Sequence, residues 1–221
     1  MNKPALIFDL DGVIVDTAHF HYNSWKKTAA VFGYDLTIQQ NEALKGVSRK
    51  RSLEKILEWA NKSITAESFE SIMEAKNQDY LAQVATMNKD DILPGVVDFL
   101  KNAKQAGCKM ALGSASKNAR TILQKVDLLD YFDAIVDGTN VSKAKPDPEV
   151  FIQGAALLAA KPEDCIVFED SVAGVTAANS AGMTSIGIGE QAVLSHAHKV
   201  FKGFTNLSLT DITKNKRTSS I

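Results

Sequence analysis

The sequence reads ALIFDLDGV at residues 5–13, close to the N-terminus. Its first part is an apolar run of strand length, which predicts a buried strand of a parallel sheet. Two carboxylates follow at Asp9 and Asp11, and Gly12 permits a turn that lets both converge on one ligand. Converging carboxylates repel one another, so they need a cation or a shared proton. Taken alone, the same pattern also fits a solvated acidic strand end or a helix cap.

Further apolar runs of strand length alternate with segments of helical spacing. The predicted strands are residues 5–10, 109–114, 134–138, 165–170 and 184–189, and the predicted helices between them are 96–106, 119–126, 150–159 and 172–181. This alternation predicts an α/β fold, a doubly wound parallel (Rossmann-like) sheet with helices on both faces. Ligands of such folds bind at the carboxyl ends of the strands. Polar residues lie at these ends: Asp9, Asp11, Ser114, Glu169 and Asp170.

The interval after the first strand has a different pattern. Residues 18–32, 49–60 and 66–84 have helical spacing with no strand-like run between them. We therefore expect an all-helical cap domain at residues 17–86, inserted into a core domain of residues 1–16 and 87–221. After residue 190 we expect an edge strand near 199–204 and a short helix. The polar residues 214–221 are expected to fray.

Composition excludes some classes of function. The 221 residues carry 25 basic and 26 acidic side chains, a formal net charge of -1, so nucleic acid is not an expected partner. No apolar run reaches the length of a membrane span, and no secretion signal is recognisable, which predicts a cytoplasmic protein. Cys108 and Cys165 each open an apolar segment and are expected to be buried free thiols.

Four motifs in order resemble those of the haloacid dehalogenase superfamily. The run FDLDGVIVDT begins at Phe8, Ser114 follows KMALG, Lys145 lies in SKAKPDP, and Glu169 and Asp170 end the run CIVFED. Four ordered motifs at strand ends or in loops are far more specific than any one of them. Lys145 taken alone would also fit a solvated loop lysine.

The resemblance implies a role for each of these residues. Asp9 would be the nucleophile that forms an aspartyl phosphate, and Asp11 the general acid and base. Ser114 and the amide of Ala115 would hold phosphate oxygens at a helix start, and Lys145 would offset negative charge. Magnesium is the implied cofactor, because it takes oxygen ligands beside substrate phosphates. Its ligands would be Asp9, the backbone oxygen of Asp11, Glu169 and Asp170. One of the last two could instead cap the following helix.

The helical interval is similar to that of the β-phosphoglucomutases. LKGVSR at residues 44–49, Lys76-Asn77 and SASKN at 114–118 carry this resemblance, which runs through nearly all of residues 4–189. It implies a substrate-binding set of Thr17, His21, Trp25, Lys45, Gly46, Val47, Ser48, Arg49, Ser52, Lys76, Ala115, Ser116, Lys117 and Asn118. His21 could also be a helix histidine without a substrate contact, and Lys45 to Arg51 a solvated basic helix start.

A phosphomutase needs a second anion site for the phosphate that is not being transferred. Arg49 has a planar guanidinium suited to phosphate, with Ser116, Lys117 and Asn118 in support. The resemblance therefore implies a magnesium-dependent mutase that converts β-glucose 1-phosphate to glucose 6-phosphate through a bisphosphate. A sugar-phosphate phosphatase of the same superfamily and a catalytically silent binding protein are the alternatives. A small-molecule sugar phosphate and a monomeric chain are expected.

Overall fold

The computed structural model describes residues 3–213, and within them six parallel strands form one sheet in the order β3-β2-β1-β4-β5-β6. The strands are β1 (Ala5–Phe8), β2 (Met110–Gly113), β3 (Ala134–Val136), β4 (Cys165–Glu169), β5 (Thr184–Ile188) and β6 (Lys199–Phe201). The predicted doubly wound parallel sheet is confirmed, and β1 lies inside it between β2 and β4. The carboxyl ends of β1 and β4 are therefore neighbours.

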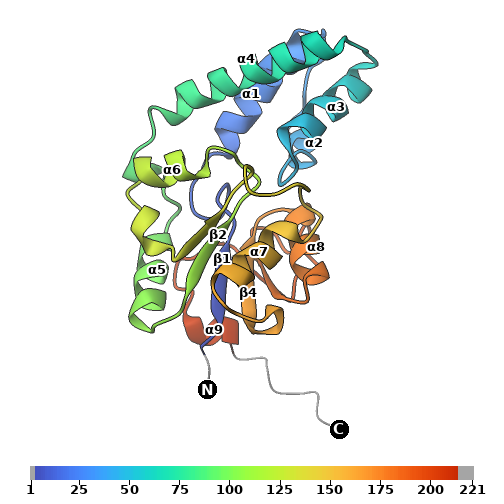
Figure 1. Ribbon diagram of the computed structural model, residues 1–221. Helices are drawn as coiled ribbons and strands as arrows, with labels where there is room; N and C mark the ends of the chain where they lie inside the picture. Colours follow the sequence, from blue (N-terminus) through green and yellow to red (C-terminus); the bar gives the residue numbers. More distant parts are fainter. Residues whose placement is uncertain (1–2, 214–221) are drawn as a thin grey trace.

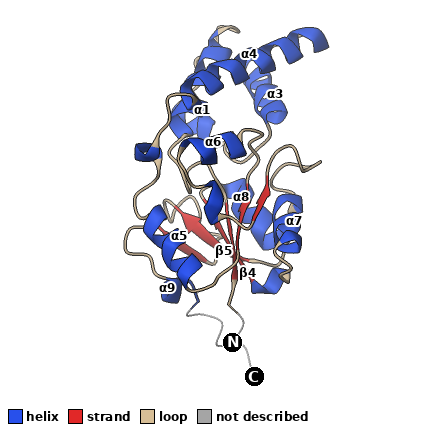
Figure 2. Cartoon of the chain, turned by 60° about the vertical axis from the view of Figure 1, so that its left-hand side comes forward, coloured by secondary structure: helices blue, strands red, loops and turns tan. Residues whose placement is uncertain are grey.

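Helices cover both faces of this sheet (Figures 1 and 2). They are α5 (Val96–Gln105), α6 (Ala119–Lys125), α7 (Glu149–Leu157), α8 (Val172–Ser180) and α9 (Leu209–Thr213), with single turns η1 (Lys89–Asp91), η2 (Leu129–Tyr131) and η3 (Pro162–Asp164). Successive side chains of a strand point to opposite faces. In β1, Leu6 and Phe8 accordingly pack with α5, α6 and α9, whereas Ala5 and Ile7 pack with α7 and α8. Burial on both faces explains why the strand sequence is an unbroken apolar run.

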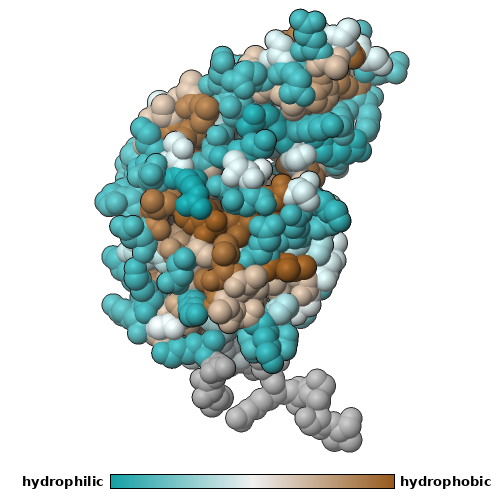
Figure 3. All heavy atoms as spheres, viewed as in Figure 1, coloured by the Kyte–Doolittle hydropathy of each residue, from teal (hydrophilic) through white to brown (hydrophobic). Residues whose placement is uncertain are grey.

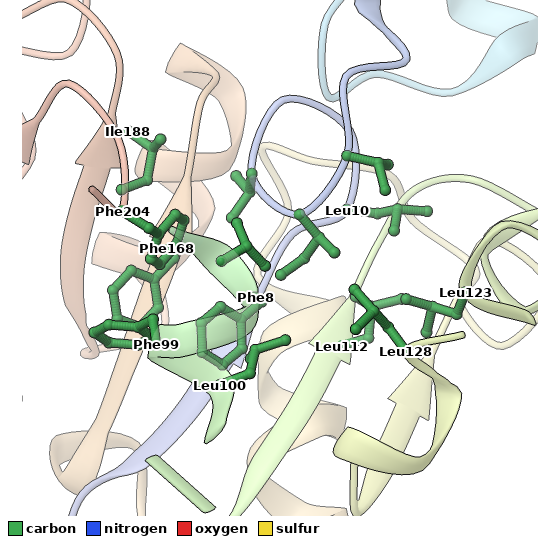
Figure 4. Packing of buried hydrophobic residues seen from close by; sticks show 14 of the residues in the cluster. Phe8, Leu10, Phe99, Leu100, Leu112, Leu123, Leu128, Phe168, Ile188 and Phe204 are labelled. Atoms are coloured by element: carbon green, nitrogen blue, oxygen red, sulfur yellow. The ribbon is translucent and has the colours of Figure 1, made fainter. Parts of the chain in front are cut away.

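An aromatic cluster fills the face under α5 (Figure 4). The rings of Phe8 and Phe168 are stacked with centroids 4.6 Å apart, and Phe99 meets Phe168 edge-on at 5.4 Å. Phe204, from the segment after β6, packs on Phe99 with centroids 5.1 Å apart. Aromatic pairs in these geometries add to the stabilisation that burial gives. The ends of β1 and β4, which precede the predicted catalytic residues, are thereby held in fixed register.

A separate group of helices lies above the carboxyl ends of the strands (Figure 1). These are α1 (Ala18–Ala30), α2 (Ile38–Glu42), α3 (Arg49–Ala60) and α4 (Ala66–Val84). They share an apolar cluster of their own, made of Trp25, Ala29, Leu36, Leu44, Leu53, Ile56 and Leu57. The helical character predicted for this interval is confirmed, while its division from the rest as a cap domain remains a proposal.

The sequence predicts no helix between residues 32 and 49, and α2 in this interval is a finding of the structure. Its signal is local: the Thr37 side chain accepts from the Gln40 amide, and the Gln40 side chain accepts from the Thr37 amide. This reciprocal capping box starts a helix of only five residues, too short to show helical periodicity.

The segment after β5 follows the prediction, with β6 at the sheet edge and α9 after it. The expectation that 214–221 are frayed falls outside the described residues. Cys108 and Cys165 are buried and form no disulfide within the described residues, as predicted. None of the helices within residues 3–213 combines the length and the apolar character of a membrane span.

The face seen in Figure 3 is largely hydrophilic over the upper helices and carries apolar side chains lower down, over the sheet. Ile152 and Leu157 of α7 are among the exposed apolar residues, at 46% and 63% exposure. The monomeric state expected from the sequence stays a prediction.

Candidate active site

The acidic residues converge where the chain turns after β1. Gly12 has a φ of +78°, and a Cβ atom there would lie 2.2 Å from Asp170 Oδ2. Only glycine therefore allows the turn to approach the end of β4 so closely. Asp9, Glu169 and Asp170 each place an oxygen within 4.8 Å of the others. Carboxylates from β1 and β4 thus converge, but the β1 contribution to this cluster is Asp9 alone and not the predicted pair of Asp9 and Asp11.

Lys145 joins two of these carboxylates from a loop between β3 and α7. Its Nζ donates to Asp9 Oδ1 at 2.6 Å, to Glu169 Oε1 at 2.5 Å and to the Gly113 carbonyl at 3.0 Å. The residue is 3% exposed. Burial alone would lower the pKa of Lys145, but the charges of Asp9 and Glu169 outweigh it and raise that pKa. Lys145 is thus a buried cation paired with two carboxylates, and the solvated loop lysine is excluded.

The remaining negative charge suits a divalent cation. Burial raises the pKa of Asp9 well above its usual value, and Glu169, Asp11 and Asp170 raise it further against the opposing effect of Lys145. Burial, with the charge of Glu169, raises the pKa of Asp170 to about 7 although Lys45 lies 3.3 Å from it. Burial and neighbouring negative charge both disfavour the ionised form of these carboxylates, and a bound cation would offset both effects. The all-oxygen donor set fits a hard cation such as magnesium.

Glu169 differs from the other acids because both of its oxygens are already bonded. Oε1 accepts from Lys145, while Oε2 accepts from the Ser171 amide at 3.1 Å and its hydroxyl at 2.9 Å. The cap of α8 is Ser171 itself, which accepts from the Gly174 amide. Neither Glu169 nor Asp170 is the cap, so that alternative is wrong. Asp170 is the freer potential ligand of the two.

A chain of polar contacts links Asp11 to the upper helices. Its carboxylate accepts a hydrogen bond from the Thr17 hydroxyl and lies 3.7 Å from His21 Nε2. His21 Nδ1 lies 3.2 Å from Lys76 Nζ. Burial would raise the pKa of Asp11, but the hydrogen bonds and charges of His21, Thr17 and Lys145 lower it overall. Burial, together with the charge of Lys76, lowers the pKa of His21, and the ring presents its Nε2 side to Asp11. His21 is therefore in contact with the predicted acid and base Asp11, and its contact with substrate stays a prediction.

Lys76 occupies an aromatic pocket. Its Nζ lies 4.6 Å from the Trp25 ring centroid and 4.7 Å from that of Tyr80. The residue is 4% exposed, and burial, with a further contribution from the charge of Arg49, lowers its pKa to about 7. The Tyr80 hydroxyl is buried without a hydrogen-bond partner among the described residues. Trp25 thus contacts Lys76, which is predicted to bind substrate, and also packs in the apolar cluster of the upper helices.

A third group connects the upper helices with the loop after β2. Arg49 Nη2 donates to Asn77 Oδ1 at 2.7 Å, and Asn118 Nδ2 lies 3.3 Å from the same oxygen. The Ser116 amide donates to the Ser114 hydroxyl at 3.1 Å. The helix α6 begins at Ala119, as predicted, and residues 114–118 form a loop before it. The reason is local, because the Ser114 and Ser116 side chains bond the amides two residues ahead and hold a turn.

One cavity of about 380 Å³ brings most predicted residues together. Those lining it are Asp9, Asp11, His21, Trp25, Lys45, Gly46, Val47, Ser48, Arg49, Ser52, Lys76, Ala115, Ser116, Lys117, Asn118 and Asp170. Thr17, Ser114, Lys145 and Glu169 are buried and absent from this lining. The cavity also has lining residues that the sequence analysis missed: Ala18, Asn41, Leu44, Lys50, Met73, Tyr80, Gly138 and residues 141–144. The capping box of Thr37 and Gln40 could have indicated the helix that carries Asn41, though not the burial of Asn41 in the cavity. Residues 142–144 belong to the SKAKPDP motif, in which only Lys145 was predicted as a site residue.

Comparisons with known proteins agree with this geometry. Residues 3–182 match the family of haloacid dehalogenase-like hydrolases. The chain is 40% identical over 207 residues to a β-phosphoglucomutase of Bacillus subtilis, covering 93% of this chain and 92% of that protein. It is 31% identical over 184 residues to a phosphorylated carbohydrates phosphatase of Thermotoga maritima, at 82% and 83% coverage. A crystal structure of a β-phosphoglucomutase from Clostridium difficile matches with a TM-score of 0.92, 40% identity and 96% coverage of both chains.

Proposed function

The chain is an enzyme of the haloacid dehalogenase-like hydrolase family, and from this premise we propose that it is a β-phosphoglucomutase. It interconverts β-D-glucose 1-phosphate and β-D-glucose 6-phosphate through an aspartyl phosphate and β-glucose 1,6-bisphosphate. The similarity to β-phosphoglucomutases over nearly the whole chain supports this proposal.

The observation that carries it is a single cavity with groups suited to a phosphate in two places. One is at Asp9, beside the buried cation Lys145. The other is at Arg49, which hydrogen-bonds Asn77, with Lys117 and Asn118 in the same lining. A mutase must hold the phosphate being transferred and the phosphate that stays, whereas a phosphatase needs only the first. The second group is the feature that favours the mutase.

We propose that the Asp9 carboxylate attacks phosphorus, forming an O–P bond while the bond from phosphorus to the sugar oxygen breaks. The sugar phosphate takes the phosphoryl group from phosphorylated Asp9 at its free hydroxyl and becomes a bisphosphate. The bisphosphate reorients within the site and returns its other phosphoryl group to Asp9. Asp11 accepts the proton of the attacking hydroxyl in the first transfer and protonates the leaving sugar oxygen in the second.

The remaining groups hold charge and position. Lys145 offsets the negative charge that spreads over the transferring oxygens. Thr17 and His21 hold Asp11 as a carboxylate, the form that accepts a proton. Asp9, Asp170, the backbone oxygen of Asp11 and, in the same cluster, Glu169 would hold magnesium, which supplies charge compensation for the phosphoryl oxygens when bound.

The helical segment 17–86 would act as the cap. Lys45 reaches Asp170, and a Cβ atom on Gly46 would lie 2.6 Å from Ser171 Oγ, so the segment touches the acidic cluster directly. Such contacts keep water from the aspartyl phosphate, because water attack would make the enzyme a phosphatase. The phosphatase is the second candidate, favoured by the 31% identity to a carbohydrate phosphatase.

A phosphorus NMR time course separates the two candidates. The chain would be incubated with β-glucose 1-phosphate, magnesium and a trace of β-glucose 1,6-bisphosphate. We expect glucose 6-phosphate to accumulate with little inorganic phosphate. Inorganic phosphate and free glucose as the main products would replace the mutase with the phosphatase.

A further inference from the structure

Asn41 is a buried polar residue in the cavity that the proposed cycle does not use. It lies on α2, is 6% exposed and lines the same cavity as Asp9 and Arg49. Its backbone is engaged, since the amide donates to the Thr37 carbonyl and the carbonyl accepts from Leu44. Its side-chain amide makes no hydrogen bond to any residue of the described chain, 3–213.

Such a side chain is available to a ligand. A side-chain amide offers two donor hydrogens and an acceptor oxygen, and here these groups open to the cavity rather than to protein partners. Other polar side chains of the lining already have protein partners. Ser52 donates to the Ser48 carbonyl at 3.1 Å, Asn118 lies against Asn77, and Lys45 pairs with Glu42 and Asp170. Asn41 therefore keeps its full bonding capacity for whatever occupies the cavity.

The position of Asn41 along the cavity is fixed by its neighbours. The capping box of Thr37 and Gln40 starts α2, and Lys55 Nζ donates to the Ala43 carbonyl at its end. Lys45, four residues after Asn41, reaches Asp170 of the acidic cluster. The Asn41 amide is thus held on a braced helix, and the chain that follows this helix reaches the acidic cluster through Lys45.

We propose that the Asn41 side chain hydrogen-bonds a ring hydroxyl of the bound sugar and so selects the sugar; this rests on the proposed function. An uncharged hydroxyl is the matching group, because phosphate already has cationic partners in this cavity. A carboxamide can both donate and accept. The two orientations of the bisphosphate place different ring hydroxyls against the same side chain. A carboxamide can donate to or accept from the hydroxyl in either orientation, while an aspartate could only accept.

The test compares the unaltered chain with Asn41→Ala and Asn41→Asp. Substrates are β-glucose 1-phosphate and its 2-, 3- and 4-deoxy analogues, and both sugar 6-phosphate and inorganic phosphate are measured. Gln39→Ala is the matched control, since Gln39 is exposed on the same helix. Thermal unfolding of each variant reports whether the fold is kept.

We expect Asn41→Ala to lower kcat/KM for β-glucose 1-phosphate by roughly 10- to 100-fold, as for loss of a buried hydrogen bond to substrate. For at least one deoxy analogue the same substitution should cost much less, because the partner hydroxyl is already missing. Asn41→Asp should lose activity as well, and Gln39→Ala should match the unaltered chain.

Equal losses with all four substrates would overturn the proposal, since a purely structural role does not distinguish hydroxyls. Failure of the proposed function is seen separately, in the unaltered chain releasing inorganic phosphate without sugar 6-phosphate. In that case the loss caused by Asn41→Ala is measured as phosphate release from each of the four substrates. A much smaller loss with one deoxy analogue supports the proposal, and equal losses overturn it.

Discussion

Lys145 and Asp9 lie 136 positions apart in the chain, and their side chains meet in a 2.6 Å hydrogen bond within the protein interior. Asp9 follows β1, whereas Lys145 comes from the loop before α7, so the contact depends on the whole central sheet being formed. A buried carboxylate is an unfavourable nucleophile unless positive charge keeps it ionised. The geometry assigns this task to Lys145.

Replacing Lys145 with methionine should abolish most turnover. The Asp9 and Glu169 carboxylates would face each other without the buried cation, so the pKa of Asp9 would rise further and its ionised fraction would fall. We expect a fall in kcat of roughly 100-fold or more, as for removal of one charge-stabilising group. Lys101→Met, at an exposed position of α5, is the control and should keep full activity. Near-normal turnover of Lys145→Met would remove the proposed role.

Asp9→Ala should remove covalent phosphorylation as well as turnover. The variant keeps the turn at Gly12 and loses one carboxylate, so the fold should survive, as circular dichroism would show. Intact-mass spectrometry after treatment with acetyl phosphate should detect a phosphoryl adduct on the parent chain and none on the variant. Residual mutase activity above about 1% of the parent would contradict Asp9 as the nucleophile.

Magnesium should stabilise the folded chain, because an ion that binds only the folded state raises its stability by mass action. We expect the midpoint of thermal unfolding to rise with magnesium concentration and to return on addition of a chelator. Asp170→Asn removes a proposed ligand from the cluster and should show a much smaller rise. Identical magnesium dependence in both proteins would place the ion elsewhere.

Lys76 should make stability depend on pH. Its pKa is about 7 in the folded chain against 10.5 for a free lysine, with burial the main cause. Between these values the unfolded chain binds the extra proton, so the free energy of unfolding rises with pH there. Relative to Lys76→Met, the parent should therefore gain stability between pH 7 and pH 9 in urea unfolding. A constant difference between the two proteins across that range would show that the lysine titrates normally.

The sequence predicted those parts of the fold that depend on local pattern. The strand around Ile7 is an unbroken apolar run because both faces of β1 are covered, and the helices α3 and α4 begin and end within a residue of their predicted limits. It missed α2, whose five residues are set by the capping box of Thr37 and Gln40 and show no period.

For the site, the motifs identified the charged residues but not their partners. Lys145 and Asp9 were named separately, while their bond and the two-sided bonding of Glu169 depend on the sheet order. Asn41 and Tyr80 were missed because an isolated polar or aromatic residue on a helix carries no sign of burial in a cavity. Three-dimensional packing supplies that information.

Arg49→Lys should separate the mutase from simple hydrolysis. Arg49 binds Asn77 at 2.7 Å and lines the cavity with Asn118, so it is placed to hold the phosphate that is not being transferred. Lysine keeps the charge but loses the planar, two-point contact. We expect KM for β-glucose 1-phosphate to rise by roughly 10-fold or more, as for a lost charged hydrogen bond. Hydrolysis of acetyl phosphate, which has only one phosphate, should change little.

Arg51→Lys, an exposed neighbour on α3 that pairs with Glu54 and Glu58, is the matched control. Equal losses of mutase activity and acetyl phosphate hydrolysis would show that Arg49 serves the reacting phosphate, and the two-phosphate reading of the cavity would fail.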